Sequence, residues 1–332
     1  MVNGEPAENP QQNPSMDDGR TDAGGAPAGV SALGVRRRFG SVEAVRGMDF
    51  TAPPGAVTAL IGPNGSGKTT LLLMLASLLA PDAGEVRICG FDPAADPGQV
   101  RSRVGWMPDT LGTWDSLTAT EILVTMGALY GMAPAAARNR AGELLETVHL
   151  SELASKPARV FSRGQQQRLS LARALIHDPE VLLLDEPASG LDPGSRVDLR
   201  LLLRRLAGEG KTVVVSSHVL AELDEMADRA VFVARGETVT TQSLADAGVQ
   251  ARWYTVRALH DGSLLRQLDA LQVPHRIQGD DRRPSVQVRL AGEGAAAELL
   301  RSLVHADVAV IAFAPAGGAL EETYMSLDTD RR

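Results

Sequence analysis

The chain is poor in cysteine and has no long uninterrupted apolar run. Its 332 residues include a single cysteine, Cys89, which excludes an internal disulfide and fits a reducing cytoplasm. The longest apolar stretch runs from Leu71 to Ala80 and stops at Pro81, short of the roughly 18 to 20 residues that a membrane span needs. The N-terminus lacks a basic region followed by an apolar segment, so we expect no secretory signal. These absences favour a cytoplasmic protein without a membrane segment of its own.

Positive charge is also scarce. The net charge is −8, and half of this excess lies in residues 1–30, which hold five acidic side chains and one arginine. Neutralisation of phosphates by Lys and Arg dominates affinity for nucleic acids. We therefore expect no nucleic-acid partner for an acidic chain without a basic stripe. The one compact basic run, Arg36–Arg38, either forms a solvated strand edge or contacts a partner or the phosphates of a nucleotide.

The pattern of apolar residues divides the chain into segments. Residues 1–30 are rich in Gly, Pro, Asn, Gln and Asp and carry few large apolar side chains, so we expect a disordered tail. Over residues 31–248, strand-like segments alternate with helical ones. The runs VLLLD and TVVVSS are apolar at successive positions, as expected for central parallel strands that are covered on both faces. This pattern predicts an α/β domain.

Two further segments depart from this alternation. Residues 106–174 are mainly helical in pattern, and Thr118 with Glu121 predicts a capping box at the start of one helix. We interpret this segment as a helical subdomain inserted between strands of the sheet. Residues 250–332 then follow the order β-α-β-β-α-β, which predicts a small C-terminal α+β domain of the ferredoxin-like type.

A glycine-rich loop, GPNGSGKT, follows the strand-like segment VTALI and precedes a helical one. This is the context of a phosphate-binding loop, in which the glycines let backbone amides point at phosphate oxygens. Lys68 is placed to bridge the β- and γ-phosphates, and the Thr69 hydroxyl to bind Mg²⁺. The expected nucleotide contacts are Gly62, Pro63, Asn64, Gly65, Ser66, Gly67, Lys68, Thr69 and Thr70.

Two predicted core strands end in side chains that can bind a metal ion, activate a water molecule or contact a phosphate. VLLLDEP ends in Asp185, suited to hold Mg²⁺, and Glu186, suited to orient or deprotonate an attacking water. TVVVSSH ends in His218, which can donate a hydrogen bond to a γ-phosphate. Nucleotide sites of such sheets lie at these strand ends.

The element Ser162–Gln165 stands shortly before the strand that ends in Asp185. Together with the phosphate loop, this element indicates that a nucleotide is bound from two sides and that the protein is an ATPase that works by closing a dimer. In this order of motifs, residues 31–245 resemble the ATP-binding subunit of an ABC transporter. The resemblance implies a P-loop NTPase core in which Asp185 and Glu186 end the Walker B strand, His218 is the switch histidine, and Ser189–Asp192 is the D-loop. It also implies that Phe39 stacks on adenine, and that a second subunit's nucleotide meets Ser162, Gly164 and Gln165.

Two positions depart from the family pattern. Asp109 stands where a glutamine is usual; a carboxylate there can still bind Mg²⁺, but it adds negative charge beside the acidic strand end. Arg163 stands at the first glycine of the usual LSGGQ motif. Its guanidinium either supplies charge toward phosphate or ribose or turns to solvent.

The resemblance also implies partners. These are ATP and Mg²⁺, a second copy or a paralogous ATPase subunit, and a separate six-helix membrane permease. The segments ADRAVFVARGETV and GALEETYMSL are similar to those of drug, lipid or polysaccharide exporters. We therefore expect a peripheral subunit on the cytoplasmic face of the membrane. The rivals are a soluble ABC-type ATPase of DNA repair, chromosome maintenance or translation, and a regulatory ATPase whose C-terminal domain binds a small ligand.

Overall fold

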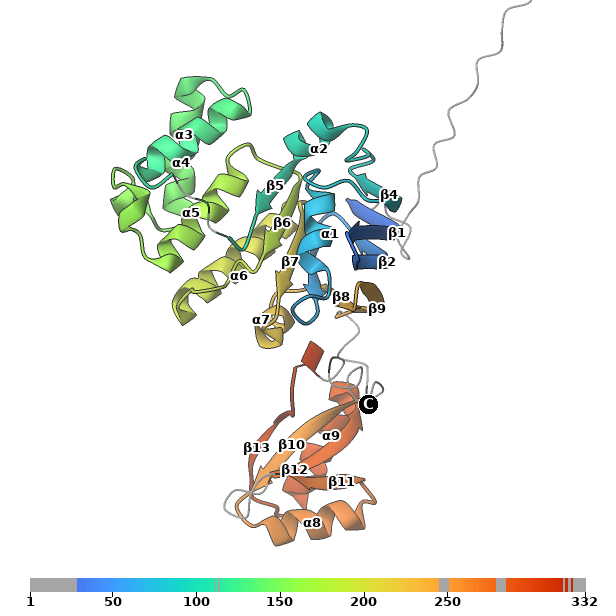
Figure 1. The fold of residues 1–332 in the computed structure, drawn as a ribbon. Helices are drawn as coiled ribbons and strands as arrows, with labels where there is room; N and C mark the ends of the chain where they lie inside the picture. Colours follow the sequence, from blue (N-terminus) through green and yellow to red (C-terminus); the bar gives the residue numbers. More distant parts are fainter. Residues whose placement is uncertain are drawn as a thin grey trace, which may run out of the picture.

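The computed structural model of the chain describes residues 29–110, 112, 114–244, 251–278, 285–318, 320–321 and 324. Residues 1–28, nearly all of the expected disordered tail, lie outside the described residues. In the described ranges, no helix combines the length and apolarity that a membrane crossing requires. Figure 1 shows two separate sheet-containing parts along the chain, joined after β9.

A six-stranded sheet forms the centre of the larger part. All of its neighbouring pairs are parallel except the last, β8–β9. Every residue of β3, β6 and β7 is buried, which confirms the prediction of central parallel strands covered on both faces. In sheet order the strands are β5 Val104–Met107, β6 Val181–Asp185, β7 Thr212–Ser217, β3 Val57–Ile61, β8 Arg229–Ala234 and β9 Glu237–Ser243.

The two faces of this sheet belong to two apolar cores. Successive strand side chains point to opposite faces, so Leu182 and Leu184 pack in one core and Val181 and Leu183 in the other. The first core packs against helices that include α5 and α6, and the second against α1. The helices of this part are α1 Lys68–Leu75, α2 Pro97–Arg103, α3 Ala119–Leu129, α4 Pro134–Thr147, α5 Arg163–Leu175, α6 Pro193–Gly208 and α7 Leu220–Asp224.

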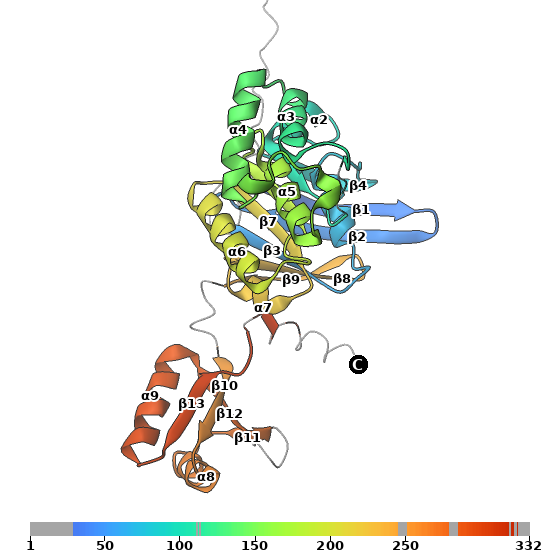
Figure 2. The same cartoon turned by 90° about the vertical axis from the view of Figure 1, so that its left-hand side faces the viewer.

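A three-stranded antiparallel sheet lies beside the central sheet. Its order is β2 Val42–Ala52, β1 Val30–Phe39 and β4 Ala83–Ile88. Figure 2 shows the β1–β2 hairpin projecting from the body of the protein. Arg36–Arg38 lie on β1, where Arg37 makes a 2.6 Å ion pair with Asp82.

Helix α3 begins with the capping box that the sequence predicts. Thr118 caps α3: its hydroxyl accepts from the Glu121 N–H at 3.2 Å, and the Glu121 carboxylate accepts from the Thr118 N–H at 2.8 Å. One boundary differs from the expected one: strand β5 extends to Met107, so the helical stretch begins after it. Helix α4 ends at Thr147, because His149 has the left-handed φ of 55° that stops a helix.

The C-terminal part has the predicted element order. Its antiparallel sheet runs β11 His275–Gln278, β12 Ser285–Ala291, β10 Ala251–Ala258 and β13 Val310–Pro315, with helices α8 Asp261–Ala270 and α9 Gly292–His305. Beyond this sheet the chain returns to the larger part. Leu320 is fully buried in the first core, and its N–H donates to the Asp224 carboxylate at 3.0 Å. The red end of the ribbon beside α7 in Figure 1 marks this return.

Candidate functional site

The phosphate loop joins β3 to α1 under tight steric constraint. Gly67 has a φ of 98°, and a Cβ there would lie 2.6 Å from the Ala44 carbonyl oxygen. A Cβ at Gly62 would lie 2.2 Å from the Val233 carbonyl oxygen. Glycine is therefore required at both positions, since a side chain would collide with the backbone of a neighbouring strand. The predicted helix follows at once and brings the N-terminal N–H groups of α1 to the loop.

Lys68 folds back over this loop. Its ammonium donates to the Gly62 carbonyl at 2.7 Å and to the Pro63 carbonyl at 3.2 Å. Burial lowers the pKa of Lys68, and the nearby charges of Glu186 and Asp185 oppose that shift. The cation thus sits in the interior beside two carboxylates, where an anion gains more from it than in water.

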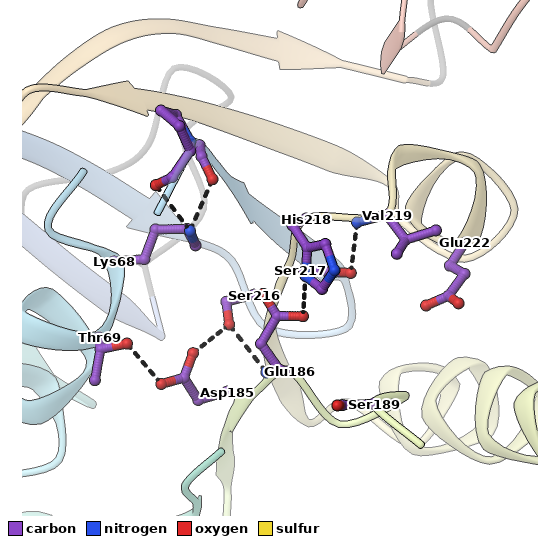
Figure 3. Close-up of polar contacts among 12 residues, drawn as sticks. Lys68, Thr69, Asp185, Glu186, Ser189, Ser216, Ser217, His218, Val219 and Glu222 are labelled. Atoms are coloured by element: carbon purple, nitrogen blue, oxygen red, sulfur yellow. Dashed lines mark hydrogen bonds and ion pairs between the residues drawn. The ribbon is translucent and has the colours of Figure 1, made fainter. Parts of the chain in front are cut away.

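Asp185 is held at the end of β6 by two hydroxyl groups. Thr69 Oγ1 donates to Asp185 Oδ2 at 2.8 Å, and Ser216 Oγ donates to Asp185 Oδ1 (Figure 3). The strand pairing explains the second contact, because Asp185 and Ser216 are register partners in β6 and β7. The sequence interpretation did not single out Ser216. Its only signal was a polar residue inside the apolar run TVVVSS.

Glu186 leaves the strand abruptly. Its φ of 51° lies in the left-handed region that non-glycine residues seldom occupy. The Glu186 N–H donates to the Ser216 hydroxyl at 3.1 Å, and the Glu186 carbonyl accepts from Gln167 Nε2 at 2.9 Å. These contacts satisfy the backbone N–H and carbonyl groups of Glu186 at the turn. Gln167 was not predicted either.

The Glu186 carboxylate meets His218 from the end of β7. Oε2 of Glu186 and Nδ1 of His218 are 2.9 Å apart, and a dashed line marks this contact in Figure 3. Burial raises the pKa of Glu186, and His218 opposes this shift. A carboxylate with a raised pKa is a stronger base toward water than an exposed one.

Lys68, Asp185 and Glu186 line one open pocket of about 550 Å³, whereas His218 is not part of its lining. Its lining joins the phosphate loop, the acidic strand end and Asp109, all of them predicted, to two arginines that were not. Arg46 lies on β2 and Arg235 in the β8–β9 turn. The predicted lining residues are Asn64, Gly65, Gly67, Lys68, Thr69, Thr70, Asp109, Asp185 and Glu186.

Other predicted residues lie outside the lining of this pocket. Gly62, Pro63 and Ser66 make hydrogen bonds within the loop. The Gly62 and Pro63 carbonyls accept from the Lys68 ammonium, and the Ser66 N–H donates to the Pro63 carbonyl at 3.2 Å. Phe39 is 47% exposed at the end of β1, with the Arg37 guanidinium 5.1 Å from its ring centre.

Backbone pairing brings the two unpredicted arginines to the loop. The Arg46 N–H donates to the Gly236 carbonyl at 2.7 Å, and the Gly236 N–H donates to the Ser66 carbonyl at 3.1 Å. Segments that are far apart in the sequence therefore form one wall of the pocket. No local motif marks either arginine, so only the fold reveals them.

The Ser162–Gln165 element caps helix α5. The Gln165 N–H donates to the Ser162 hydroxyl at 3.3 Å, and the Ser162 N–H donates to the Gln165 side chain at 2.9 Å. Ser162, Gly164 and Gln165 are absent from the lining of the phosphate-loop pocket. Arg163 donates to the Ser189 hydroxyl at 3.0 Å. Within the chain the guanidinium therefore contacts the segment that follows Glu186, which is neither of the two orientations expected from the sequence.

Comparison with known proteins identifies the family of this chain. The family model described as ABC transporter matches residues 45–189. The daunorubicin/doxorubicin resistance ATP-binding protein DrrA of Streptomyces peucetius is 30% identical, over 90% of this chain and 92% of that protein. The Nod factor export ATP-binding protein I of Ralstonia nicotianae is 37% identical, over 63% of this chain and 65% of that protein.

A solved structure gives the same picture. The dimeric post-hydrolysis state of the ATP-binding cassette MJ0796, bound to ADP and Pi, matches 65% of this chain and 98% of that one, with a TM-score of 0.60 and 28% identity. The expected P-loop NTPase fold of the ABC type is thereby confirmed. Because the likeness to the resistance protein extends over nine tenths of the chain, and the pocket brings the phosphate loop to the acidic strand end, this protein belongs to the ATP-hydrolysing, ATP-binding subunits of ABC transporters.

Proposed function

We propose that this chain hydrolyses ATP as one half of a cassette dimer and so drives export through a separate membrane permease. We infer the dimer from the division of the nucleotide site between two separate surfaces of the chain. The phosphate loop, Asp185 and Glu186 line one pocket, whereas the Ser162–Gln165 element of the same chain does not reach it. A second copy, or a paralogous subunit, supplies that element from the other side, which the dimeric structure of the similar cassette MJ0796 supports.

Within each pocket the residues take distinct roles. The loop amides and Lys68 bind the β- and γ-phosphates. Glu186 orients the attacking water and accepts its proton, for which its raised pKa suits it. His218 contacts the Glu186 carboxylate, fixes its direction and donates a hydrogen bond to the γ-phosphate. Phe39 stacks on adenine from the end of β1.

The oxygen atoms at the strand end suit Mg²⁺. Thr69 and Asp185 present a hydroxyl and a carboxylate oxygen 2.8 Å apart, and Mg²⁺ prefers one or two carboxylates together with substrate phosphates. Asp109, on the lining of the same pocket, offers a further carboxylate. When bound, the ion neutralises charge that develops on the transferred phosphoryl group. Ser216 keeps Asp185 oriented for this role.

Export of drug-like molecules is the transport activity that the comparisons favour. Two of the similar proteins are named for daunorubicin and doxorubicin resistance and for Nod factor export. The similarity to DrrA spans 90% of this chain and so includes part of residues 250–332, which we assign to a C-terminal accessory domain. The permease would hold the transported molecule, and this subunit would bind the permease on the cytoplasmic face of the membrane.

Co-expression tests the membrane partnership. The protein would be produced with and without a candidate exporter permease, and detergent extracts would be purified through a tag on this chain. We expect the membrane protein to co-purify and inside-out vesicles to take up daunorubicin when ATP is added. Vesicles that carry Glu186→Gln serve as the matched control. Recovery of this chain without any membrane protein, with equal uptake in both vesicles, would contradict the proposal.

A further inference from the structure

The Arg163 side chain packs against the turn at Gly190, a residue without a side chain. Its guanidinium donates to the Ser189 hydroxyl at 3.0 Å, and its stem lies against Gly190. A Cβ at Gly190 would lie 2.9 Å from Arg163 Cδ and 3.0 Å from Cγ. Gly190 also has a φ of 75°, which disfavours any other residue. The long side chain at 163 and the bare backbone at 190 are therefore complementary.

The same turn is connected to the hydrolytic residue. The Ser189 N–H donates to the Glu186 carbonyl at 3.1 Å, and that carbonyl also accepts from Gln167 Nε2 at 2.9 Å. Gln167 lies on α5, one turn after Arg163. Helix α5 is thus linked twice to the segment 186–190, once through a backbone carbonyl and once through a guanidinium.

We propose that Arg163 is a positioning residue that clamps the Ser162–Gln165 element to the Ser189–Gly190 turn of its own chain, an inference that rests on the dimeric function proposed above. The element faces the nucleotide of the second subunit, whereas the turn follows the Glu186 of its own site. The clamp makes the two move as one unit. Nucleotide bound at one site then sets the geometry of Glu186 at the other.

The clamp has one clear alternative, in which the guanidinium reaches across to the second subunit's nucleotide. The two differ in their dependence on Ser189. A clamp needs the Ser189 hydroxyl, so removing either partner removes the same interaction. A direct phosphate contact needs only Arg163, so replacing Arg163 would lower kcat by the same factor whether or not Ser189 has also been replaced. Coupling between two substitutions measures this difference.

The test is a double-mutant cycle in the full-length protein. Arg163→Met keeps most of the stem and removes the donor, and Ser189→Ala removes the acceptor. For each variant and for the double variant, kcat, KM and the Hill coefficient for ATP would be measured. We expect each single change to lower kcat roughly threefold to tenfold and to lower the Hill coefficient, with KM little changed, because a partly exposed bond from a charged donor is worth little more.

The double variant decides the proposal. We expect it to be no slower than the slower single variant, and Arg163→Lys, which can still donate to Ser189, to recover part of the rate. Arg159→Met, a change at an exposed arginine four residues earlier, controls for the loss of positive charge and should leave all three parameters unchanged. Additive losses in the double variant, or an Arg163→Met protein with wild-type kinetics, would overturn the clamp.

A separate measurement keeps the two proposals apart. ATP-dependent dimerisation of the Glu186→Gln variant, followed by size-exclusion chromatography with light scattering, reports on the dimer alone. If that variant stays monomeric, the proposed function fails and the clamp fails with it. If it dimerises while the cycle is additive, only the clamp is wrong.

Discussion

The Nδ1 atom of His218 lies 2.9 Å from Oε2 of Glu186, at the ends of two adjacent parallel strands. The Glu186 backbone at this contact has a left-handed φ of 51°. One carboxylate thus faces Thr69 and Ser216, and the next faces the histidine. Adjacent acidic residues thereby serve two different purposes within one pocket.

Replacing the proposed base should separate binding from hydrolysis. Glu186→Gln keeps the shape of the side chain and one acceptor oxygen, but the amide cannot accept a proton at neutral pH. We expect kcat to fall by roughly a hundredfold or more, while ATP binding persists and a stable dimer accumulates. The checks are steady-state ATPase rates and light scattering with ATP. Glu209→Gln, at the exposed end of α6, is the matched control. A wild-type rate in Glu186→Gln would remove the residue from catalysis.

Asp109 should influence the Mg²⁺ requirement. It lines the pocket that holds Asp185, and a carboxylate attracts the ion more strongly than an amide does. We expect Asp109→Gln to raise the Mg²⁺ concentration for half-maximal ATPase activity, roughly threefold or more. Titration of MgCl₂ at fixed ATP measures this midpoint. The exposed Asp307→Asn variant should titrate like wild type, and an unchanged midpoint in Asp109→Gln would exclude the residue from the ion site.

The two unpredicted arginines should favour ATP binding. Arg46 and Arg235 line the same pocket as Lys68, and a guanidinium attracts a polyphosphate. We expect Arg46→Ala or Arg235→Ala to raise KM for ATP about twofold to tenfold at low ionic strength with kcat nearly unchanged, and the effect to shrink with added salt. The exposed Arg138→Ala variant on α4 is the control. Equal KM values at low salt would show that neither guanidinium contacts the nucleotide.

His177 should make stability depend on pH. Its ring stacks on Tyr130 with centroids 3.7 Å apart, and burial lowers its pKa to about 4 from an ordinary 6.5. Between pH 4 and pH 6.5 the His177 ring binds a proton in the unfolded chain but not in the folded one. The contribution of neutral His177 to the free energy of unfolding is therefore fully present above about pH 6.5 and is lost as the pH falls toward 4. After a discount for partial exposure, the loss is about 1–2 kcal/mol.

Urea unfolding at pH 7.5 and 5 measures that loss. We expect His177→Phe, which keeps the stacked ring but cannot titrate, to lose less stability than wild type over this interval. The exposed His305→Phe variant should retain the wild-type difference. If His177→Phe and wild type lose the same free energy of unfolding, the histidine does not control the pH dependence.

Much of the site could be predicted because its groups are adjacent in sequence. The loop residues from Asn64 to Thr70 need no distant partner to curl around a phosphate, and Asp185 and Glu186 follow one apolar run. Arg46, Arg235 and Ser216 could not be found in this way. Their role depends on which strands are neighbours: β7 beside β6, and the β8–β9 turn beside β2.

The amino-acid order alone determined the α/β core, the phosphate loop and the family, because these depend on local periodicity and on glycines where side chains would collide. Only the tertiary structure decided where Arg163 points. A guanidinium on a long stem has many rotamers in an isolated segment. The bare turn at Gly190 and the hydroxyl of Ser189, 26 residues further along, select one of them.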